Sequence, residues 1–363
     1  MNKIKILFCI DKLVRGGTEL QLIGLIKHLD RTIFEPHLLT IRESDSDLIP
    51  EDCIHLHWPT SKIFAPQGFL TGLKLTKYLN NQNISIVQTF FQDSTILAGA
   101  AAKLANVPVR ISCFRDMGFW QSTLQNFVLK RINHVMTGHI ANAQIVARHF
   151  HQAYAIPMEK MAIFPNGLDQ NTLPFSQARD RVANIAMVGN MTRQVKRFDL
   201  FVAAAALVSE NHPDIRWHII GEGHLRSDLE QQARELGVLD KIIFTGRISH
   251  IPDYLNDIDI GIICSDSEGL SNAIIEYMFK GVTTIATNVG GNPELVEHTT
   301  TGLLVEAGDH QQLADQILNL IKHPELRHQL AQNARDTVEK KYSWEYCVQA
   351  HQNYYLQQLE GLR

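Results

Sequence analysis

The stretch KIKILFCIDKLVRGGTE, Lys3 to Glu19, contains the unit from which this chain is built. An apolar run ends at Asp11, the glycine pair Gly16 and Gly17 follows, and a helical pattern begins at Glu19. A buried strand that leads through a glycine-rich turn into a helix is the first half of a β–α–β unit. The two glycines also let backbone N–H groups approach an anion at the start of that helix.

The same alternation recurs through the 363 residues. Further buried strands are expected at PHLLTI, CIHLHW, ISIVQTF, VPVRISCF, HVMTGHI and MAIFPN in the first half, and at NIAMVGN, IRWHIIG, KIIFTGR, IDIGIICS and TTIATN in the second. Helical patterns lie between several of them, at Glu19–Leu29, Gly68–Asn80, Ser94–Ala105, Phe198–Asn211, Leu225–Leu236 and Asn272–Lys280. This alternation predicts the α/β class, with parallel sheets covered by helices on both faces.

The length suits two domains. The join is expected in the polar segment Gly167 to Asn184, which has no strand pattern. We therefore predict two doubly wound Rossmann-like domains, at residues 1–172 and 182–342, that face each other across a cleft. Ligands of such sheets bind beyond the carboxyl ends of the strands, so the cleft is the expected site.

Charge and composition exclude several classes of protein. The net charge of −4 argues against nucleic-acid binding. Residues 1–172 hold 17 Lys/Arg against 13 Asp/Glu, and residues 173–363 hold 17 against 25, so the halves carry +4 and −8. Either the first half meets an anionic partner or the asymmetry is chance.

The first apolar run is too short for a signal peptide, and no segment is long enough to span a bilayer. A cytoplasmic protein that can rest on a membrane surface is expected.

No metal or disulfide pattern is present in the sequence. The five cysteines are scattered and odd in number, which is typical of reduced packing residues. The 17 histidines form no HExxH motif or His-plus-Cys cluster, so no metal site is expected. The acidic triplet at residues 45–47 lies in a polar loop outside the expected site, and we discount it as a metal motif.

Basic residues follow the first strand of the second half, in GNMTRQVKRFDL, Gly189 to Leu200. Arg193 and Lys196 lie between a strand and a helix, where they could bind phosphate. The Arg guanidinium can donate two parallel hydrogen bonds to a phosphate, whereas the Lys ammonium acts as a point charge. A solvated basic helix start is the alternative. Arg197 could exchange roles with Arg193.

Two further glycine-rich turns follow strands. GEGHLR, from Gly221, lacks the third glycine of GxGxxG, so a hydride-transferring dinucleotide enzyme is only weakly supported. In VGGNPELV, a proline at the first helical position leaves the amides around Gly290 and Gly291 directed at a phosphate. A plain strand-to-helix turn is the alternative there.

The stretch EGLSNAIIEYMFKG, Glu268 to Gly281, combines two carboxylates with an apolar helix. If Asn272–Lys280 is helical and stops at Gly281, then Asn272 and Glu276 share one face. A carboxylate at the edge of a core needs hydrogen-bond donors, and sugar hydroxyls are suitable ones. A structural ion pair and a solvent-exposed helix face are the alternatives.

The order of these motifs resembles the family 4 retaining glycosyltransferases with the GT-B fold. The resemblance covers nearly the whole chain and is strongest from Asn166 to Val296. EGLSNAIIE is similar to the E-x7-E signature of that family. The motifs that carry the resemblance, in order, are VRGGTE, FPNGLD, VGNMTRQVKRFD, IIGEG, FTGR, EGLSNAIIE and GGNPELV.

The resemblance implies roles for residues in this chain. Glu268 would accept hydrogen bonds from the donor sugar, Glu276 from the nucleotide ribose, and Arg193 and Lys196 would hold the diphosphate. Glu268, Arg193 and Lys196 form the implied catalytic set. The implied donor-binding set is Gly16, Gly17, Asn190, Gly221, Arg247, Leu270, Ser271, Asn272, Glu276, Gly290 and Gly291. The donor would be a UDP-, GDP- or ADP-sugar, and no cofactor or metal is expected.

Two positions depart from the pattern of the family. Members often have Gly-Arg after the first strand of the second domain, where this chain has Asn190, so Arg193 is the expected substitute. Members also often have a histidine near the reacting sugar, where this chain reads SCFRDMGFW. Arg115 and Asp116 are therefore expected on the acceptor side.

The expected function is transfer of a sugar, with retention, to a glycan or lipid-linked acceptor in polysaccharide or glycoconjugate biosynthesis. The departing phosphate oxygen itself would deprotonate the acceptor. The first domain would bind the acceptor, and the terminal segment 343–363 would pack back on it. The segment Asp116 to Ile132 is either an interfacial helix that touches anionic lipid or an ordinary core helix. Another GT-B enzyme, such as a nucleotide-sugar epimerase or phosphorylase, and a non-catalytic glycosyltransferase-like partner are the alternatives.

Overall fold

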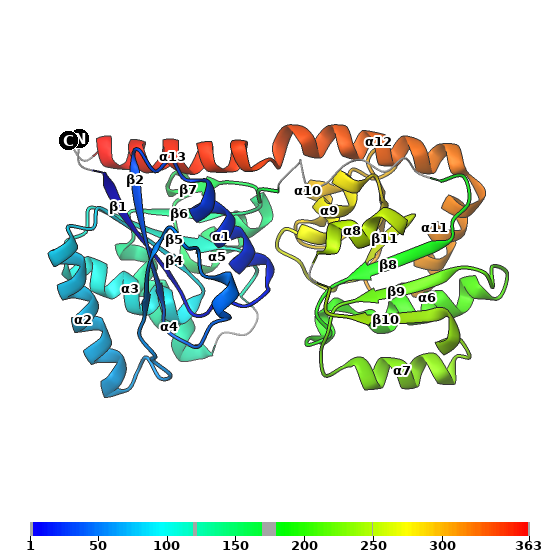
Figure 1. Ribbon diagram of the computed structural model, residues 1–363, viewed down its shortest axis with the longest axis horizontal. Coiled ribbons are helices and arrows are strands. Elements are labelled where there is room, and N and C mark those ends of the chain that lie inside the picture. The colour runs from blue at the N-terminus through cyan, green and yellow to red at the C-terminus, as the bar shows by residue number, and fades with distance from the viewer. Residues whose placement is uncertain (1–2, 119–121, 169–178, 249, 362–363) are drawn as a thin grey trace. The chain divides into compact units, whose positions relative to one another are not determined.

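The chain forms two compact units, each built on its own parallel sheet (Figure 1). The computed structural model describes residues 3–118, 122–168, 179–248 and 250–361. The first unit comprises Met1–Gly167 with Trp344–Arg363, and the second comprises Leu168–Ser343. Both sheets are covered by helices, which confirms the predicted α/β class with two Rossmann-like domains. Residues 169–178 of the expected join, and Phe119 and Trp120 of the expected membrane segment, lie outside the described residues.

The first unit has a seven-stranded parallel sheet of order β3-β2-β1-β4-β5-β6-β7. Its strands are β1 (Ile4–Ile10), β2 (Phe34–Thr40), β3 (Ile54–His57), β4 (Ile86–Phe90), β5 (Val109–Phe114), β6 (Gly138–Ala141) and β7 (Met161–Ile163). Each predicted strand of this half is present. The expectation that all are buried is wrong for β3 and β7, which lie at the sheet edges and are only partly covered.

Alternate residues of β1 point into two separate cores, because successive side chains of a strand face opposite sides of the sheet. Ile6 and Phe8 pack with α1 (Gly17–His28) and α13 (Trp344–Glu360), whereas Leu7 and Cys9 pack with α2 (Pro66–Gln82) and α3 (Gln92–Leu104). The helices of this unit are α1 (Gly17–His28), α2 (Pro66–Gln82), α3 (Gln92–Leu104), α4 (Thr123–Val135), α5 (Gln144–Tyr154) and α13 (Trp344–Glu360), with short 3-10 turns η1 (Ser46–Leu48) and η2 (Met158–Lys160).

The C-terminal helix α13 is held by an indole ring that lies over two glycines. A Cβ at Gly24 would come within 1.9 Å of the Trp344 ring, and one at Gly167 within 2.4 Å. The His28 ring stacks on the same indole at 5.2 Å. Farther along α13, the buried Tyr355 hydroxyl donates a hydrogen bond to Gln88 Oε1 of β4 at 2.5 Å. The core of the first unit is therefore completed by a helix from the far end of the chain.

The second unit has a six-stranded parallel sheet of order β10-β9-β8-β11-β12-β13. Its strands are β8 (Asn184–Val188), β9 (Arg216–Ile220), β10 (Ile242–Gly246), β11 (Ile260–Ile263), β12 (Thr283–Thr287) and β13 (Leu303–Val305). The first five were predicted. β13 was missed, because three residues are too few to show a period.

Helices cover both faces of this second sheet. They are α6 (Phe198–Ser209), α7 (Arg226–Glu235), α8 (Ile251–Tyr254), α9 (Asn272–Lys280), α10 (Asn292–Leu295), α11 (His310–Lys322) and α12 (Pro324–Lys341), with 3-10 turns η4 (Gln194–Lys196), η5 (Leu239–Lys241) and η6 (Leu255–Asp257). The core on one face joins α6, α7 and α11 to the strands. No described helix is both long and apolar enough to cross a membrane.

One aromatic side chain fixes α9 on the opposite face. The Tyr277 ring lies against Gly261 of β11, where a Cβ would come within 2.4 Å of it. Its hydroxyl accepts a hydrogen bond from the Val188 N–H at 2.9 Å, at the carboxyl end of β8. Gly281 follows the helix with a φ of 75°, the left-handed stop that the sequence predicts. The helix is thereby held with its first turn at the carboxyl edge of the sheet.

The glycine under Trp344 gives a matched pair of helix substitutions. In a helix interior, Gly→Ala alone stabilises by roughly 0.5–1 kcal/mol. Gly72 of α2 has no atom closer than 3.7 Å to a new Cβ, so we expect Gly72→Ala to show this gain. Gly24→Ala must displace Trp344, and we expect a net loss of about 1–3 kcal/mol. Urea unfolding of both variants measures the difference, and equal stabilities would show that this contact does not hold α13.

Candidate functional site

The predicted donor-binding residues of the second unit follow the carboxyl ends of its strands. Because all strands of this sheet are parallel, the loops after β8, β9, β10, β11 and β12 leave from one edge. Those loops contain Asn190, Arg193, Lys196, Gly221, Arg247, Glu268, Leu270, Ser271, Gly290 and Gly291, and α9 begins beside them with Asn272. The topology thus gathers residues that lie up to about a hundred positions apart in the sequence.

The centre of this edge is an ion pair between two predicted catalytic residues. Lys196 Nζ donates to Glu268 Oε1 at 2.6 Å, and the Ser265 hydroxyl donates to the same oxygen at 2.6 Å. The Glu268 side chain is 9% exposed and that of Lys196 is 31% exposed. No hydrogen bond to the other oxygen, Oε2, is found among the described residues. One carboxylate oxygen is therefore occupied and the other is available to a ligand.

The loop after β12 supports Glu268 through its backbone. Gly290 has a φ of 52°, and a Cβ there would come within 1.9 Å of the Glu268 carbonyl oxygen. Only glycine fits this contact. The Thr287 hydroxyl donates to the Ser265 carbonyl at 2.6 Å, which ties the end of β12 to the loop that carries Glu268. Gly290 is therefore required for packing, whatever its amide binds.

The structure distinguishes the three basic residues of the Gly189–Leu200 segment. Arg197 forms ion pairs with Asp199 and Asp266, each at 3.0 Å, which raise the pKa of its guanidinium. It is therefore committed to holding the loop, and an exchange of roles with Arg193 is not supported. Arg193 and Asn190 lie exposed on the same loop. Lys196 is the cation of this segment that contacts Glu268.

Gly221 has a structural reason to be glycine. Its φ is 142°, and a Cβ would come within 2.1 Å of the Gly189 carbonyl oxygen. The Met191 N–H donates to the Glu222 carbonyl at 2.8 Å, so the loops after β8 and β9 are joined. Arg247 follows β10 and is exposed. A contact of Gly221 or Arg247 with a nucleotide stays a prediction.

Glu276 is partly buried on α9, one turn after Asn272. Burial raises the pKa of this carboxyl to about 7, and no hydrogen bond or ion pair to it is found among the described residues. The cap residue Ser271 makes no side-chain hydrogen bond to the first turn of the helix. The helix start therefore offers backbone N–H groups to an anion, with an unpaired carboxyl one turn away.

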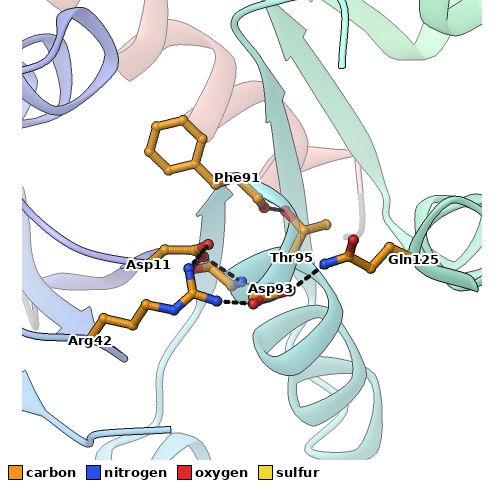
Figure 2. Close-up of polar contacts among 7 residues, drawn as sticks. Asp11, Arg42, Phe91, Asp93, Thr95 and Gln125 are labelled. Carbon is orange, nitrogen blue, oxygen red and sulfur yellow. Dashed lines mark hydrogen bonds and ion pairs between the residues drawn. The ribbon is translucent and has the colours of Figure 1, made fainter. Parts of the chain in front are cut away.

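The first unit contains a charged cluster that the sequence analysis missed (Figure 2). Asp11 follows β1, Arg42 follows β2, and Asp93 lies in the first turn of α3. The Arg42 guanidinium pairs with Asp93 and, at 3.3 Å, with Asp11. Asp11 Oδ1 also accepts the Ser94 N–H at 2.8 Å and the Ser94 hydroxyl at 2.5 Å. The cluster joins the carboxyl ends of three strands.

This cluster is largely satisfied, and its role is to hold the loops at this edge. Burial raises the pKa of Asp11 to about 6, even with Arg42 beside it. Asp93 also accepts a hydrogen bond from Gln125 Nε2 of α4 at 3.1 Å. Phe91, directly before α3, has a φ of 63°, and its carbonyl accepts the Thr95 hydroxyl at 2.5 Å. The sequence signal was present, since Asp11 and Asp93 each come within three residues of the end of an apolar strand.

Two other predicted loops of the first unit carry charges of their own. A Cβ at Gly16 would come within 2.4 Å of a carboxylate oxygen of Glu19, which is 7% exposed. The Glu19 side chain therefore already lies beside the Gly16–Gly17 turn at the start of α1. Residues 45–47 were discounted as a metal motif. There, Asp47 forms a surface ion pair with Arg15 at 2.7 Å.

Arg115 and Asp116 line a pocket at the carboxyl ends of β4 and β5 in the first unit. The space that a water-sized molecule can enter is about 40 Å³, which is well below the range of small-molecule sites. Phe91 and Thr95, which adjoin the charged cluster, also line it. Arg115 and Asp116 are neighbours in the sequence, and their acceptor-side role stays a prediction.

Comparison with known proteins identifies the class. Residues 15–172 match the family model described as Glycosyltransferase Family 4, and residues 169–337 match Glycosyl transferases group 1. HepE of Anabaena, solved in complex with UDP and glucose, superposes with a TM-score of 0.85 at 22% identity, over 97% of this chain and 99% of that one. The fold is the GT-B fold, as predicted.

Curated relatives agree with this class. The chain is 32% identical over 164 residues to N-acetyl-α-D-glucosaminyl L-malate synthase of Bacillus anthracis, which covers 45% of this chain and 42% of that protein. It is 27% identical over 262 residues to UDP-Gal:α-D-GlcNAc-diphosphoundecaprenol α-1,3-galactosyltransferase of Escherichia coli, 65% of this chain and 66% of that protein. The matches thus span less than two thirds of these relatives. The chain is a homologue of glycosyltransferases.

Glu276 provides a test of the site without any substrate. The pKa of this carboxyl rises from an ordinary 4.5 to about 7 on folding, so the folded state binds an extra proton between these pH values. The contribution of the Glu276 carboxyl to the free energy of unfolding is fully present below about pH 4.5 and is lost as pH rises through 7. We expect Glu276→Gln to be close to wild type at pH 5 and about 1–3 kcal/mol more stable at pH 8.

Denaturant unfolding across this pH range measures the effect. Glu210→Gln, which removes an exposed carboxylate of the same unit, is the control and should follow wild type at every pH. If Glu276→Gln were destabilised, or differed from wild type equally at all pH values, the Glu276 carboxylate would have to be paired or well solvated.

Proposed function

We propose that the protein is a retaining family 4 glycosyltransferase. It transfers a sugar from a nucleotide diphosphate sugar to a glycan or lipid-linked acceptor, in polysaccharide or glycoconjugate biosynthesis. The observation that carries this proposal is the Lys196–Glu268 pair, held at the edge of the second sheet by Ser265 and by the turn at Gly290. Loops that hold a cation, a carboxylate and backbone amides at one edge of the sheet suit a sugar linked to a diphosphate.

The two oxygens of Glu268 have different tasks in this proposal. Oε1 is bound to Lys196 and Ser265, which fix the orientation of the carboxylate. Oε2 accepts hydrogen bonds from hydroxyls of the donor sugar. Lys196 is preorganised near the position where negative charge develops as the sugar–phosphate bond breaks. Arg193, exposed on the same loop, supplies the second cation.

The remaining contacts hold the nucleotide. N–H groups at Leu270, Ser271 and Asn272, and at the turn of Gly290 and Gly291, bind the diphosphate. The Gly291 N–H makes only a long contact of 3.4 Å with the Glu268 carbonyl, so it can turn to a ligand. Ionised Glu276 accepts the ribose hydroxyls, which offsets its loss of solvation. Asn190, Gly221, Arg247, Gly16 and Gly17 remain predicted contributors.

The donor in this proposal is a UDP-sugar, among the UDP-, GDP- and ADP-sugars considered. Two comparisons support it: the Anabaena HepE structure contains UDP and glucose, and the E. coli relative is named for UDP-Gal. Cations and amides neutralise the leaving diphosphate, so no metal is required. The leaving phosphate oxygen takes the proton of the acceptor hydroxyl, and no protein nucleophile is involved.

The acceptor binds the first unit, which presents apolar and basic side chains at the surface. In α2, Phe69 is 69% and Leu70 is 64% exposed, and in α4, Leu124 and Phe127 are each 58% exposed. Residues 53–92 contain no Asp or Glu, and Lys74 and Lys77 are exposed on α2. An anionic membrane surface suits this combination. We therefore place the enzyme in the cytoplasm, peripheral to the inner face of the membrane.

Donor turnover without acceptor tests the activity. Wild type is expected to release nucleotide slowly from one member of a panel of UDP-, GDP- and ADP-sugars. Glu268→Ala and Lys196→Ala should each lower this rate by roughly 10²–10³-fold, because each loses a group directed at the reacting sugar phosphate. Glu230→Ala breaks a surface pair with Arg226 in the same unit and should retain the wild-type rate.

Three kinds of result would contradict this proposal. No binding and no turnover with any donor would leave a non-catalytic partner as the better interpretation. Turnover that persists in both site variants would mean that the Lys196–Glu268 pair is structural. Product that is an isomerised donor, or release that requires inorganic phosphate, would point instead to an epimerase or a phosphorylase.

Membrane contact is tested by vesicle sedimentation. The double variant Phe69→Ser with Leu70→Ser should bind vesicles containing anionic phospholipid at least about tenfold more weakly, since each buried apolar side chain contributes roughly 1.5–3 kcal/mol. Leu236→Ser removes an exposed leucine from the second unit and is the control. Unchanged binding of the double variant, or equal binding to neutral vesicles, would exclude α2 as the contact surface.

A further inference from the structure

Three consecutive residues after β8 contact the loop that carries Glu268. The Val195 carbonyl accepts a hydrogen bond from the Asp266 N–H at 2.8 Å. Lys196 Nζ donates to Glu268 Oε1 at 2.6 Å, and Arg197 Nη1 donates to Asp266 Oδ1 at 3.0 Å. Lys196 is therefore flanked in the chain by two residues that both bind Asp266, two positions before Glu268.

The Arg197 guanidinium connects this loop to the start of α6. Its Nε donates to Asp199 Oδ1 and its Nη2 to Asp199 Oδ2, each at 3.0 Å, so the first turn of the helix binds one edge of the guanidinium. The remaining nitrogen, Nη1, binds Asp266 in the loop after β11. Because α6 packs in the core of the second unit, the guanidinium links this loop to a helix that is held in place.

The backbone of Arg197 has a conformation that favours glycine. Its φ is 53° and its ψ is 46°, in the left-handed region, where a Cβ crowds the following carbonyl oxygen and glycine has no such penalty. The side chains of Arg197, Asp199 and Asp266 are 27%, 47% and 46% exposed, and ion pairs this exposed contribute little to folding. Stability alone therefore does not account for an arginine at this position.

We propose that Arg197, through Asp266, is a positioning residue that holds Lys196 and Glu268 together during the reaction. The proposal rests on the transferase function above and adds a bridge that lies outside the predicted donor contacts. Negative charge develops on the leaving diphosphate, and an ammonium group stabilises it best when it is already aligned. A displaced Lys196 would stabilise that charge less.

The Lys196–Glu268 pair needs such support because the donor competes for both partners. In the proposed function, the diphosphate attracts the Lys196 ammonium and sugar hydroxyls donate to Glu268. Lysine is also a point charge on a flexible stem, whereas the planar Arg197 guanidinium donates in fixed directions. The Arg197–Asp266 bridge does not depend on the donor, so it can keep the two loops together before and after binding.

Arg197→Gly tests this role, because it removes the guanidinium and relieves the backbone at the same time. We expect the rate of donor turnover to fall about 10- to 100-fold, since a small displacement of a catalytic group can cost about 10²-fold. The thermal midpoint should change little, because the relieved backbone offsets the lost ion pairs. UDP affinity should change much less than the rate, because the transition state requires closer alignment than the ground state.

Two aspartate variants separate the bridge between loops from the contact with α6. Asp266→Ala should lower the rate as Arg197→Gly does, and the double variant should be no slower than either, because the same bridge is lost. Asp199→Ala leaves the link to Asp266 in place and should cost much less. Arg181→Ala breaks a surface ion pair with Asp214 in the same unit and should retain the wild-type rate.

The reactivity of the Lys196 amine reports its position without any donor. Limiting acetic anhydride, followed by mass spectrometry of peptides, measures how fast each lysine is acetylated. Lys196 should react slowly in wild type, where it is paired with Glu268, and faster in Arg197→Gly and Asp266→Ala. Lys241, in another part of the same unit, is the internal reference and should react equally in every variant.

The outcomes separate this inference from the transferase proposal. If no donor is turned over but acetylation of Lys196 depends on Arg197, the bridge stands and the transferase proposal fails. If wild type and Arg197→Gly turn over donor equally, only the positioning role fails. A lower rate with unchanged acetylation would overturn the role, because Arg197 would then act on the donor directly. An equal loss of rate in Asp199→Ala and Asp266→Ala would also overturn it, because Arg197 would then only fix the start of α6.

Discussion

Both sheets of this protein are entirely parallel, and the positions of the functional residues follow from that constraint. A parallel strand cannot return by a hairpin, so a helix or a long connection must intervene before the next strand. Every carboxyl end then lies at one edge of its sheet. In the second unit this edge holds Lys196 and Glu268, and in the first it holds Asp11, Arg42 and Arg115. Packing against α9 and α13 fixes the loops that leave these edges.

Charges at these edges are mostly balanced within a few ångströms. Lys196 pairs with Glu268, Arg197 with Asp199 and Asp266, and Arg42 with two aspartates. Two other ionisable groups at these edges are partly buried, and no ion pair that includes either is found among the described residues. Glu276 is a carboxyl and Arg115 a guanidinium, and burial shifts the pKa of each toward its neutral form. Ionisable groups left desolvated without partners commonly mark ligand sites, and these two sit in different units.

The features that the sequence predicted best were those with a strong local pattern. The bounds of α9, Asn272–Lys280, were predicted because apolar spacing and a glycine stop agree there. Strands of the sheet interiors were found because they are continuous apolar runs. Short or amphipathic elements were missed. β13 has only three residues, and the polar residues along α5, α11 and α12 make their sequences resemble loops. β3 and β7 were expected to be buried, but strand order in the sheet, which no local pattern contains, leaves them at the edges.

By itself the sequence determined the α/β class, the glycine-rich turns and the residue types available to a sugar nucleotide, because each depends on periodicity, backbone freedom or chemistry within a few positions. The tertiary structure decided which of those residues meet. It paired Lys196 with Glu268 across 72 residues, committed Arg197 to two aspartates, and assembled Asp11, Arg42 and Asp93 into one cluster. It also placed Arg115 and Asp116 in the lining of one small pocket of the first unit. Burial and pairing depend on the packing of distant segments, and these properties set the charge and reach of each side chain.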